Sequence, residues 1–128
     1  MKTKTISRTE YFEAAHLLPG YDGPCGNLHG HSYKCAVTIT NDTDELNVDG
    51  MIVDFVEFKK IIKEKIEDKF DHKFLNDIFG TTNSTAEYMS KYIAEQVTEG
   101  LKEKGINAYC SKVELNETAK NMAIYEVK

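Results

Sequence analysis

The middle of the chain carries two segments with the apolar spacing of an α-helix, and each end carries two segments that alternate as strands do. The helical segments run roughly from Asp54 to Phe70 and from Ser84 to near Gly105. Apolar residues three and four apart share one face of a helix, and that face has to be buried. A sheet made from the two ends of the chain is the surface that can cover it.

Polar residues that cap helices mark the starts of both helical segments. Asp54 and Glu57 have the spacing of a capping box, and Ser84 and Glu87 repeat that spacing before the second segment. Gly105 is expected to end the second helix, because glycine readily adopts the left-handed backbone that follows a helix. The sequence therefore predicts two capped amphipathic helices.

Four strands are predicted from alternating apolar and polar residues between turn residues. They cover residues 3–15, 32–40, 109–115 and 122–127, and a polar turn over residues 41–50 follows the second strand. We predict an α+β fold in the order ββααββ, with two helices on one face of a four-stranded antiparallel sheet. So small a sheet has exposed edges, which favours a homo-oligomer in which copies of the chain cover them.

Length, composition and charge limit the classes of function. A chain of 128 residues with 41% hydrophobic residues fits one compact domain, 1–128. Its formal net charge of -5 argues against nucleic acid and anionic membranes as partners, because both bind basic surfaces. The sequence has no apolar stretch of about 18 residues and no signal-peptide pattern. We therefore expect a cytoplasmic protein whose partner is a small molecule.

Three of the four histidines lie near the junction of the first two predicted strands: His16, His29 and His31. Side chains two apart in an extended segment point to the same side, so His29 and His31 can face one ion while His16 supplies a third ligand. Three neutral imidazoles suit Zn²⁺ and leave a coordination position open for substrate. We interpret the cluster as a catalytic zinc site; the alternative is a polar turn beside an ordinary buried histidine.

Cys25 lies four residues before His29, in a loop over residues 17–30 that is rich in glycine and proline. A cation favours the reactive thiolate form of a nearby cysteine, so Cys25 is a candidate for acid/base chemistry. Alternatively it is a fourth zinc ligand, which would make the site structural. Cys35 and Cys110 fall in predicted strands, where cysteine usually serves as a small core residue.

Two acidic positions and the fourth histidine are further candidates. Asp71 directly precedes His72, so its carboxylate could orient the imidazole in a relay with Cys25. A capping aspartate beside a solvated histidine explains that pair equally well. Glu114 and Glu117 lie near the end of the third strand, where a carboxylate could accept two N–H bonds from a 2-amino-pyrimidinone ring. The alternative there is a surface glutamate at a turn.

Together these residues resemble the 6-pyruvoyl-tetrahydropterin synthase superfamily. The spacing Cys25-x-x-x-His29 resembles the branch that forms 6-carboxy-5,6,7,8-tetrahydropterin in queuosine biosynthesis. Each matching block is weak alone, but their order along nearly the whole chain is specific. The blocks are FEAAH (12–16), CGNLHGHSY (25–33), GMIVDF (50–55), DHKFLND (71–77), STAE (84–87) and ET (117–118).

The resemblance implies the tunnelling fold, in which monomers join through their sheets into trimers and two trimers pair as a hexamer. Active sites in this fold lie between subunits. The resemblance also implies residue roles. Zinc would be held by three ligands, His16, His29 and His31. Cys25 would be the thiolate that abstracts a proton, and Asp71 with His72 would form the relay.

For the substrate, the resemblance implies 7,8-dihydroneopterin triphosphate, a small-molecule pterin. Glu117 and Thr85 would contact the pterin, and Glu117 is also a candidate for the relay. Ser84-Thr85 stands where the family often has Pro-Thr. The expected products are 6-carboxy-5,6,7,8-tetrahydropterin, acetaldehyde and triphosphate. Two alternatives stay open: a 6-pyruvoyl-tetrahydropterin synthase, which eliminates triphosphate without cleaving the carbon chain, and a non-catalytic zinc- or pterin-binding protein.

Overall fold

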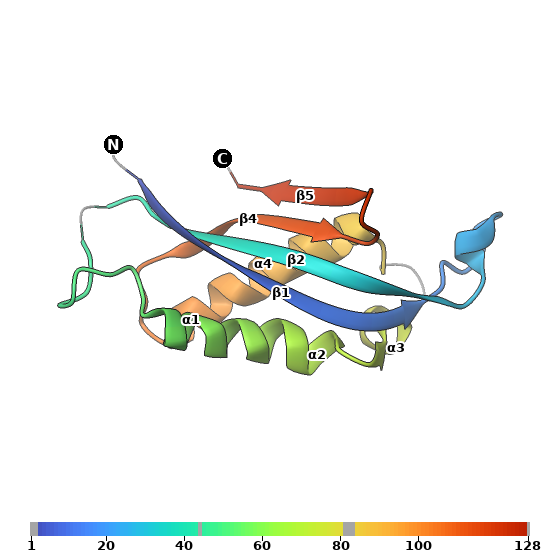
Figure 1. Ribbon diagram of the computed structural model, residues 1–128, viewed down its shortest axis with the longest axis horizontal. Coiled ribbons are helices and arrows are strands. Elements are labelled where there is room, and N and C mark those ends of the chain that lie inside the picture. The colour runs from blue at the N-terminus through green and yellow to red at the C-terminus, as the bar shows by residue number, and fades with distance from the viewer. Residues whose placement is uncertain (1–2, 44, 81–83, 128) are drawn as a thin grey trace.

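A five-stranded sheet forms one layer of the molecule. The computed structural model describes residues 3–43, 45–80 and 84–127. The strands lie in the spatial order β3-β1-β2-β4-β5, and Figure 1 shows the four long ones crossing above the helices. Their bounds are β1 Lys4–His16, β2 His29–Asn41, β3 Lys73–Phe74, β4 Tyr109–Asn116 and β5 Met122–Glu126.

The short strand β3 corrects the predicted sheet. It pairs in parallel with β1, Ala14 with Lys73 and Ala15 with Phe74, while the other strand pairs are antiparallel. The prediction of four antiparallel strands in the order ββααββ was therefore wrong, because the sheet is mixed and a fifth strand lies between the helices. A strand of two residues is too short for an alternating pattern to mark it.

Both predicted helices are present, and a short helix lies between them. The first helical segment is continuous but contains a π-helical turn, η2, in its second half. The bounds are α1 Phe55–Ile62, η2 Lys63–Glu67, α2 Asp68–Phe70, α3 Leu75–Phe79 and α4 Ala86–Glu103.

The caps of the two long helical segments agree only in part with the prediction. Asp54 caps α1 as predicted, since its side chain accepts a hydrogen bond from the backbone N–H of Val56 at 2.6 Å. At α4 the cap is Thr85, so the predicted capping box of Ser84 with Glu87 was wrong. Both hydroxyl residues can cap a helix, and the sequence alone does not rank them.

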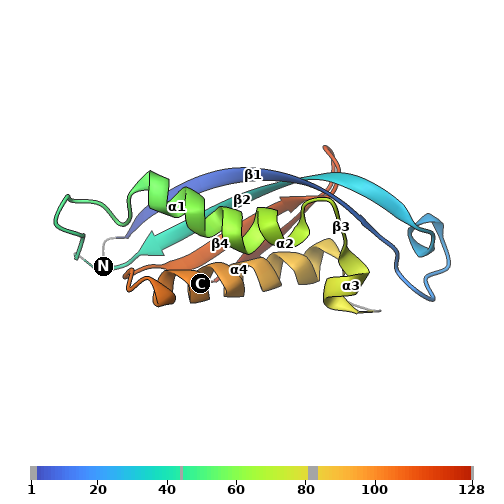
Figure 2. The ribbon, with the colours of Figure 1, turned by 90° about the horizontal axis from the view of Figure 1, so that it is seen from below.

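The helices cover one face of the sheet, as Figure 2 shows, and the core lies between the two layers. Gly105 follows the end of α4 closely and has a φ of 69°, the left-handed backbone that was predicted there. In the described part of the chain, no helix is both long and apolar enough to cross a membrane. The largest fully buried side chains include Phe12, Tyr33, Ile39, Phe58, Ile62, Ile66, Phe70, Met89, Ile93, Leu101 and Leu115.

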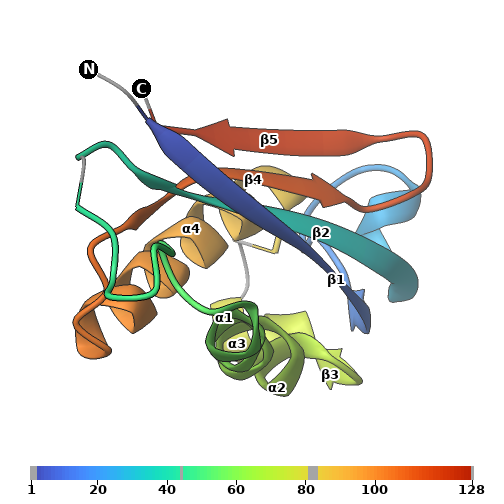
Figure 3. The same ribbon diagram turned by 60° about the vertical axis from the view of Figure 1, so that its left-hand side comes forward.

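The other face of the sheet and both of its long edges are uncovered (Figure 3). Tyr11 and Ile124 are exposed on this open face. β5 forms one edge, and on the other edge β3 pairs with β1 only at Ala14 and Ala15, so residues 4–13 have no outer partner among the described strands. Such edges can pair with another copy of the chain.

The loop between β1 and β2 brings the candidate residues to one end of the molecule. β1 and β2 pair along their full length, from Lys4 with Asn41 to His16 with His29, so β2 begins three residues earlier than predicted. The predicted irregular loop contains a 3₁₀ turn, η1 Pro24–Gly26. Asp44, within the polar turn predicted after β2, lies outside the described residues.

Candidate functional site

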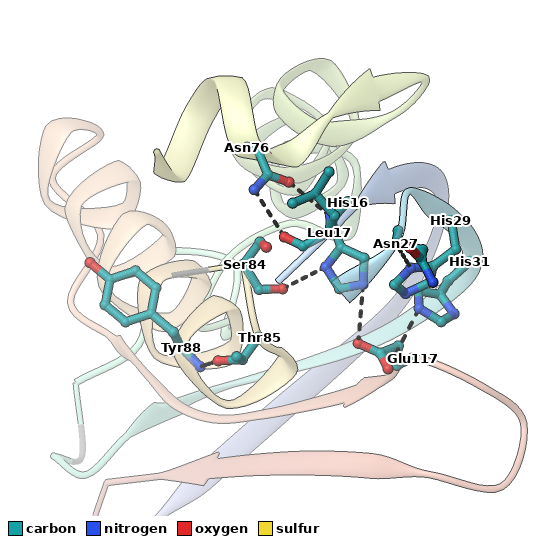
Figure 4. A network of polar contacts seen from close by, with 10 residues as sticks. All are labelled: His16, Leu17, Asn27, His29, His31, Asn76, Ser84, Thr85, Tyr88 and Glu117. Carbon is teal, nitrogen blue, oxygen red and sulfur yellow. Dashed lines mark hydrogen bonds and ion pairs between the residues drawn. The ribbon is translucent and has the colours of Figure 1, made fainter. Parts of the chain in front are cut away.

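His16, His29 and His31 project from the paired ends of β1 and β2 and meet at one point. In the β1–β2 register His16 lies opposite His29 and Ala14 lies opposite His31, so the three imidazoles share one face. Each offers a ring nitrogen, and these three atoms lie within 4.8 Å of one another. Figure 4 shows the three rings grouped beside Glu117. The predicted histidine cluster is therefore formed, at a spacing that one cation can bridge.

Backbone carbonyl groups orient two of the three imidazoles. The ring Nδ1 of His16 lies 2.9 Å from the Ser84 carbonyl oxygen, and that of His29 lies 2.7 Å from the Asn27 carbonyl oxygen. A carbonyl only accepts, so in each ring Nδ1 carries the proton and Nε2 keeps its lone pair for a metal. This is the usual outer-shell arrangement of metal-binding histidines.

Two ring nitrogens of the cluster lack a hydrogen-bond partner among the described residues. Nε2 of His16 and Nε2 of His31 are buried and unpaired within the described part of the protein. Burial is the main cause that lowers the pKa of both imidazoles, and the neighbouring His29 lowers the pKa of each further. Both effects favour the neutral imidazole, which is the form that binds metal. The donor set therefore fits zinc.

Glu117 places a carboxylate directly against the cluster. Its two oxygens lie 3.7 Å from Nε2 of His16 and 3.6 Å from Nε2 of His31. Glu117 follows the end of β4, whereas the histidines come from β1 and β2. The contact therefore joins three strands at one end of the sheet. It also raises the pKa of His16 and of His31, in opposition to their burial.

A cavity of about 380 Å³ lies beside His16 and Glu117. That volume is in the range of small-molecule sites. Cys25 lines it from η1, and Thr85 lines it from the N-terminus of α4. The remaining lining residues are Leu18, Tyr21, Ala86, Glu87, Asn121, Met122 and Ala123. Cys25, Thr85 and Glu117 therefore share one cavity, next to a candidate metal ligand.

Asp71 and His72 lie together, and neither lines the cavity that contains Cys25. His72 Nδ1 donates to the Asp71 carboxylate at 2.9 Å, and the other Asp71 oxygen accepts from the Glu13 N–H at 2.9 Å. The Glu13 hydrogen bond is the main cause that lowers the pKa of Asp71. The side chain of His72 is 80% exposed and lines a second cavity, of about 560 Å³, that also includes His31. The structure brings Asp71 to His72, but Cys25 does not line that cavity.

Four residues of the site have roles that the sequence analysis missed. Glu87 was interpreted as a capping residue, yet it lines the cavity with Glu117. Ser84 supplies the carbonyl that orients His16. Tyr33 is buried beside the histidines, and burial followed by Glu117 raises the pKa of its hydroxyl. The HGHSY block contains Tyr33, but nothing in that block shows where its hydroxyl lies.

Asn76 is the fourth missed residue, and it clamps the backbone next to His16. Its side-chain oxygen accepts from the Leu17 N–H at 3.0 Å, and its amide nitrogen donates to the Leu17 carbonyl at 3.0 Å. Figure 4 shows this pair of bonds beside the histidines. The clamp fixes the chain where β1 ends, and therefore fixes the position of His16.

Replacing Asn76 with alanine is expected to weaken the binding of a metal ion by the three histidines, by at most about 10–100-fold, the cost of losing a group bonded directly to a ligand. The reason is that β1 would lose both bonds that hold Leu17. Zinc affinity is measured by competition with a chromogenic chelator. Asn107→Ala is the control, because its side chain bonds the Thr43 hydroxyl. Equal zinc affinity in the two variants would contradict the clamp.

Comparison with known proteins points to one family. The family described as 6-pyruvoyl tetrahydropterin synthase matches residues 5–128. The 6-carboxy-5,6,7,8-tetrahydropterin synthase of Haemophilus influenzae is 45% identical over 62 residues, covering 48% of this chain and 44% of that protein. The protein of the same name from Bacillus subtilis is 33% identical over 58 residues, covering 44% of this chain and 38% of its own length. The matched segments thus span less than half of these relatives.

Solved structures with the same fold cover the whole chain. The 6-pyruvoyl tetrahydropterin synthase of Caenorhabditis elegans is 29% identical, with a TM-score of 0.80 over 100% of this chain and 98% of that one. A 6-pyruvoyl tetrahydropterin synthase from Plasmodium vivax is 18% identical, with a TM-score of 0.75 over 100% of this chain and 99% of that one. The second likeness concerns the fold alone.

Proposed function

The chain belongs to the 6-pyruvoyl tetrahydropterin synthase family, and we propose that it is a zinc-dependent lyase that makes 6-carboxy-5,6,7,8-tetrahydropterin in queuosine biosynthesis. Its substrate would be 7,8-dihydroneopterin triphosphate, and its other products acetaldehyde and triphosphate. The observation that carries this proposal is the cavity in which Cys25 and Glu117 lie beside a cluster of three histidines. The names of the partly matching relatives support the same reaction.

His16, His29 and His31 would hold the zinc ion. When bound, zinc supplies Lewis-acid chemistry that acidifies the side-chain hydroxyls of the substrate and polarises a developing carbonyl. The thiolate of Cys25 would remove a proton from the substrate side chain as a general base. Cys25 is not part of the group of ligand atoms found within 4.8 Å in the described structure, which favours a catalytic cysteine over a fourth ligand.

Glu117 and Thr85, which both line the cavity, would hold the pterin ring. A carboxylate accepts two parallel N–H bonds from a 2-amino-pyrimidinone edge. The Thr85 hydroxyl oxygen accepts from the Tyr88 N–H at 3.2 Å, so its own proton is free to donate to the ring. Glu87 lines the same cavity and adds a second carboxylate near the ring.

His72, oriented by Asp71, would exchange protons with the substrate. Its exposed ring and Cys25 line different cavities of one chain, so we propose that they meet in an assembly of several copies. The edges at β5 and at residues 4–13 of β1, which have no outer partner among the described strands, are where copies could join. A hexamer made of two trimers would complete the site.

The assembly is expected to appear in solution as a mass of about six chains, because the family resemblance implies two paired trimers and the proposed site takes residues from more than one copy. Multi-angle light scattering at micromolar protein concentration measures this mass directly. A single species of 14.5 kDa, the mass of one chain, would contradict both the hexamer and the shared site.

The Glu117→Gln variant tests the pterin anchor. Glutamine keeps the shape but puts an N–H donor where an acceptor is needed, so substrate binding should weaken by about 1–3 kcal/mol while zinc content stays the same. Calorimetry in a Cys25→Ala background, which is expected not to turn over, measures binding alone. If Glu117 acted only in the relay, affinity would be unchanged and turnover alone would fall.

The identity of the products tests the proposed reaction. Zinc-loaded protein is incubated with 7,8-dihydroneopterin triphosphate, and the products are identified by mass spectrometry. We expect a carboxypterin and acetaldehyde. A pyruvoyl product that keeps all side-chain carbons would instead assign the pyruvoyl-forming reaction. Absence of any product from zinc-loaded protein would favour the non-catalytic binding protein.

A further inference from the structure

The hydroxyl of Tyr33 is buried next to the histidine cluster and lacks a hydrogen-bond partner among the described residues. Tyr33 is 1% exposed, and its hydroxyl makes no hydrogen bond within the described part of the chain. Buried polar groups in folded proteins are nearly always paired, because an unpaired one has lost its water and gained nothing in exchange. The position of the Tyr33 hydroxyl therefore suggests that its hydrogen-bond partner comes within reach only in another state of the protein.

Packing holds the Tyr33 ring in one orientation. The ring stacks on Phe12 with the centroids 4.7 Å apart, and it meets the His31 ring edge-on with the centroids 5.5 Å apart. The β2–β4 register pairs Lys34 with Asn116. Tyr33 precedes Lys34 and Glu117 follows Asn116, so the two residues continue from the last pair of this ladder, and burial, followed by the nearby charge of Glu117, raises the pKa of the Tyr33 hydroxyl. The phenol is thus fixed beside the carboxylate that follows β4.

The histidines next to Glu117 give its carboxylate no hydrogen bond, with or without a bound cation. Its carboxylate now faces Nε2 of His16 and Nε2 of His31, at 3.7 and 3.6 Å. Neither nitrogen makes a hydrogen bond to the carboxylate at these distances, and a metal bound to the same nitrogens would keep them from donating one. Among the described residues the Glu117 carboxylate therefore lacks a hydrogen-bond donor, and the Tyr33 hydroxyl is a buried donor on a nearby strand that lacks an acceptor.

We propose that Tyr33 is a positioning residue whose hydroxyl donates a hydrogen bond to the Glu117 carboxylate in the zinc-loaded protein. The bond holds the carboxylate in the orientation that accepts the pterin N–H groups. The hydrogen bond itself follows from the histidine cluster and Glu117, whereas its effect on the pterin rests on the proposed function. Tyr33 therefore acts on the substrate only through Glu117.

A double-mutant cycle on thermal stability tests the hydrogen bond without substrate. The zinc-loaded parent, Tyr33→Phe, Glu117→Ala and the double variant are compared at one protein concentration, since Tm of an oligomer depends on concentration. We expect Tyr33→Phe to lower Tm by about 4 °C when Glu117 is present and by much less in the Glu117→Ala background. Tyr109→Phe is the matched control, because its hydroxyl bonds Asp42 at the other end of the sheet. Equal losses in both backgrounds would overturn the proposed bond.

Substrate binding tests the positioning role. In a Cys25→Ala background, Tyr33→Phe should weaken binding of 7,8-dihydroneopterin triphosphate about tenfold, as expected for a lost hydrogen bond to a charged group, without changing zinc content. The positioning role would be overturned if the Tm cycle shows coupling between Tyr33 and Glu117 while Tyr33→Phe leaves the substrate affinity unchanged. If the Cys25→Ala parent itself does not bind the pterin, the proposed function fails, and the Tm cycle still decides whether Tyr33 bonds to Glu117.

Discussion

A His16→Ala variant is expected to lose its zinc and, with it, essentially all turnover. His16 is 1% exposed and its ring is oriented by the Ser84 carbonyl, so alanine removes a ligand that the fold holds in place. Losing a direct ligand should weaken zinc binding more than about 100-fold, the upper end of the cost of losing an outer-shell partner. Zinc per chain, measured by mass spectrometry of the purified variant, gives the result.

His72→Ala is the control for that experiment. Its ring is exposed and is not part of the three-histidine cluster, so the variant should keep its zinc whatever happens to turnover. Full zinc occupancy in His16→Ala would remove His16 from the ligand set. Loss of zinc from both variants to the same extent would indicate a general folding defect, which circular dichroism of the two proteins would reveal.

A Cys25→Ala variant is expected to lose turnover by about 10²–10⁴-fold, the usual contribution of a general base, while it keeps its zinc. Cys25 lies in the cavity beside His16, but its sulfur is outside the group of potential ligand atoms in the described structure. Turnover is followed by release of triphosphate, and zinc is measured in the same samples.

Cys110→Ala is the matched control, since it removes a buried thiol from β4 that does not line the cavity with Cys25. Its zinc content and turnover should equal those of the parent. Zinc lost from Cys25→Ala in proportion to turnover would make the cysteine a fourth ligand. The non-catalytic zinc protein would then be the better account.

The long elements of the fold were predictable because their patterns are local. The alternation in β2 places Tyr33, Cys35, Val37 and Ile39 in the core, and the helical period of α4 buries Met89, Ile93 and Val97. The histidine cluster followed from the same reasoning, because residues two apart in a strand share a face. These predictions needed no knowledge of which segments meet in space.

The missed features depend on contacts between distant segments. β3 is too short to carry a pattern, and it exists as a strand because it pairs with Ala14 and Ala15 of β1. Thr85 rather than Ser84 caps α4, and the Ser84 carbonyl instead meets His16, 68 residues earlier. The clamp from Asn76 to Leu17 likewise joins residues 59 apart. No local propensity encodes such contacts.

The most direct test of the account is the release of acetaldehyde as zinc is added back to metal-free protein. The protein is stripped with a chelator, supplied with 7,8-dihydroneopterin triphosphate, and titrated with zinc while acetaldehyde is measured. If the three histidines hold the zinc ion that drives cleavage of the carbon chain, release should be absent at first, rise in proportion to added zinc and level off at one zinc per chain. Acetaldehyde released at the full rate by metal-free protein, or none released at full zinc occupancy, would contradict the account.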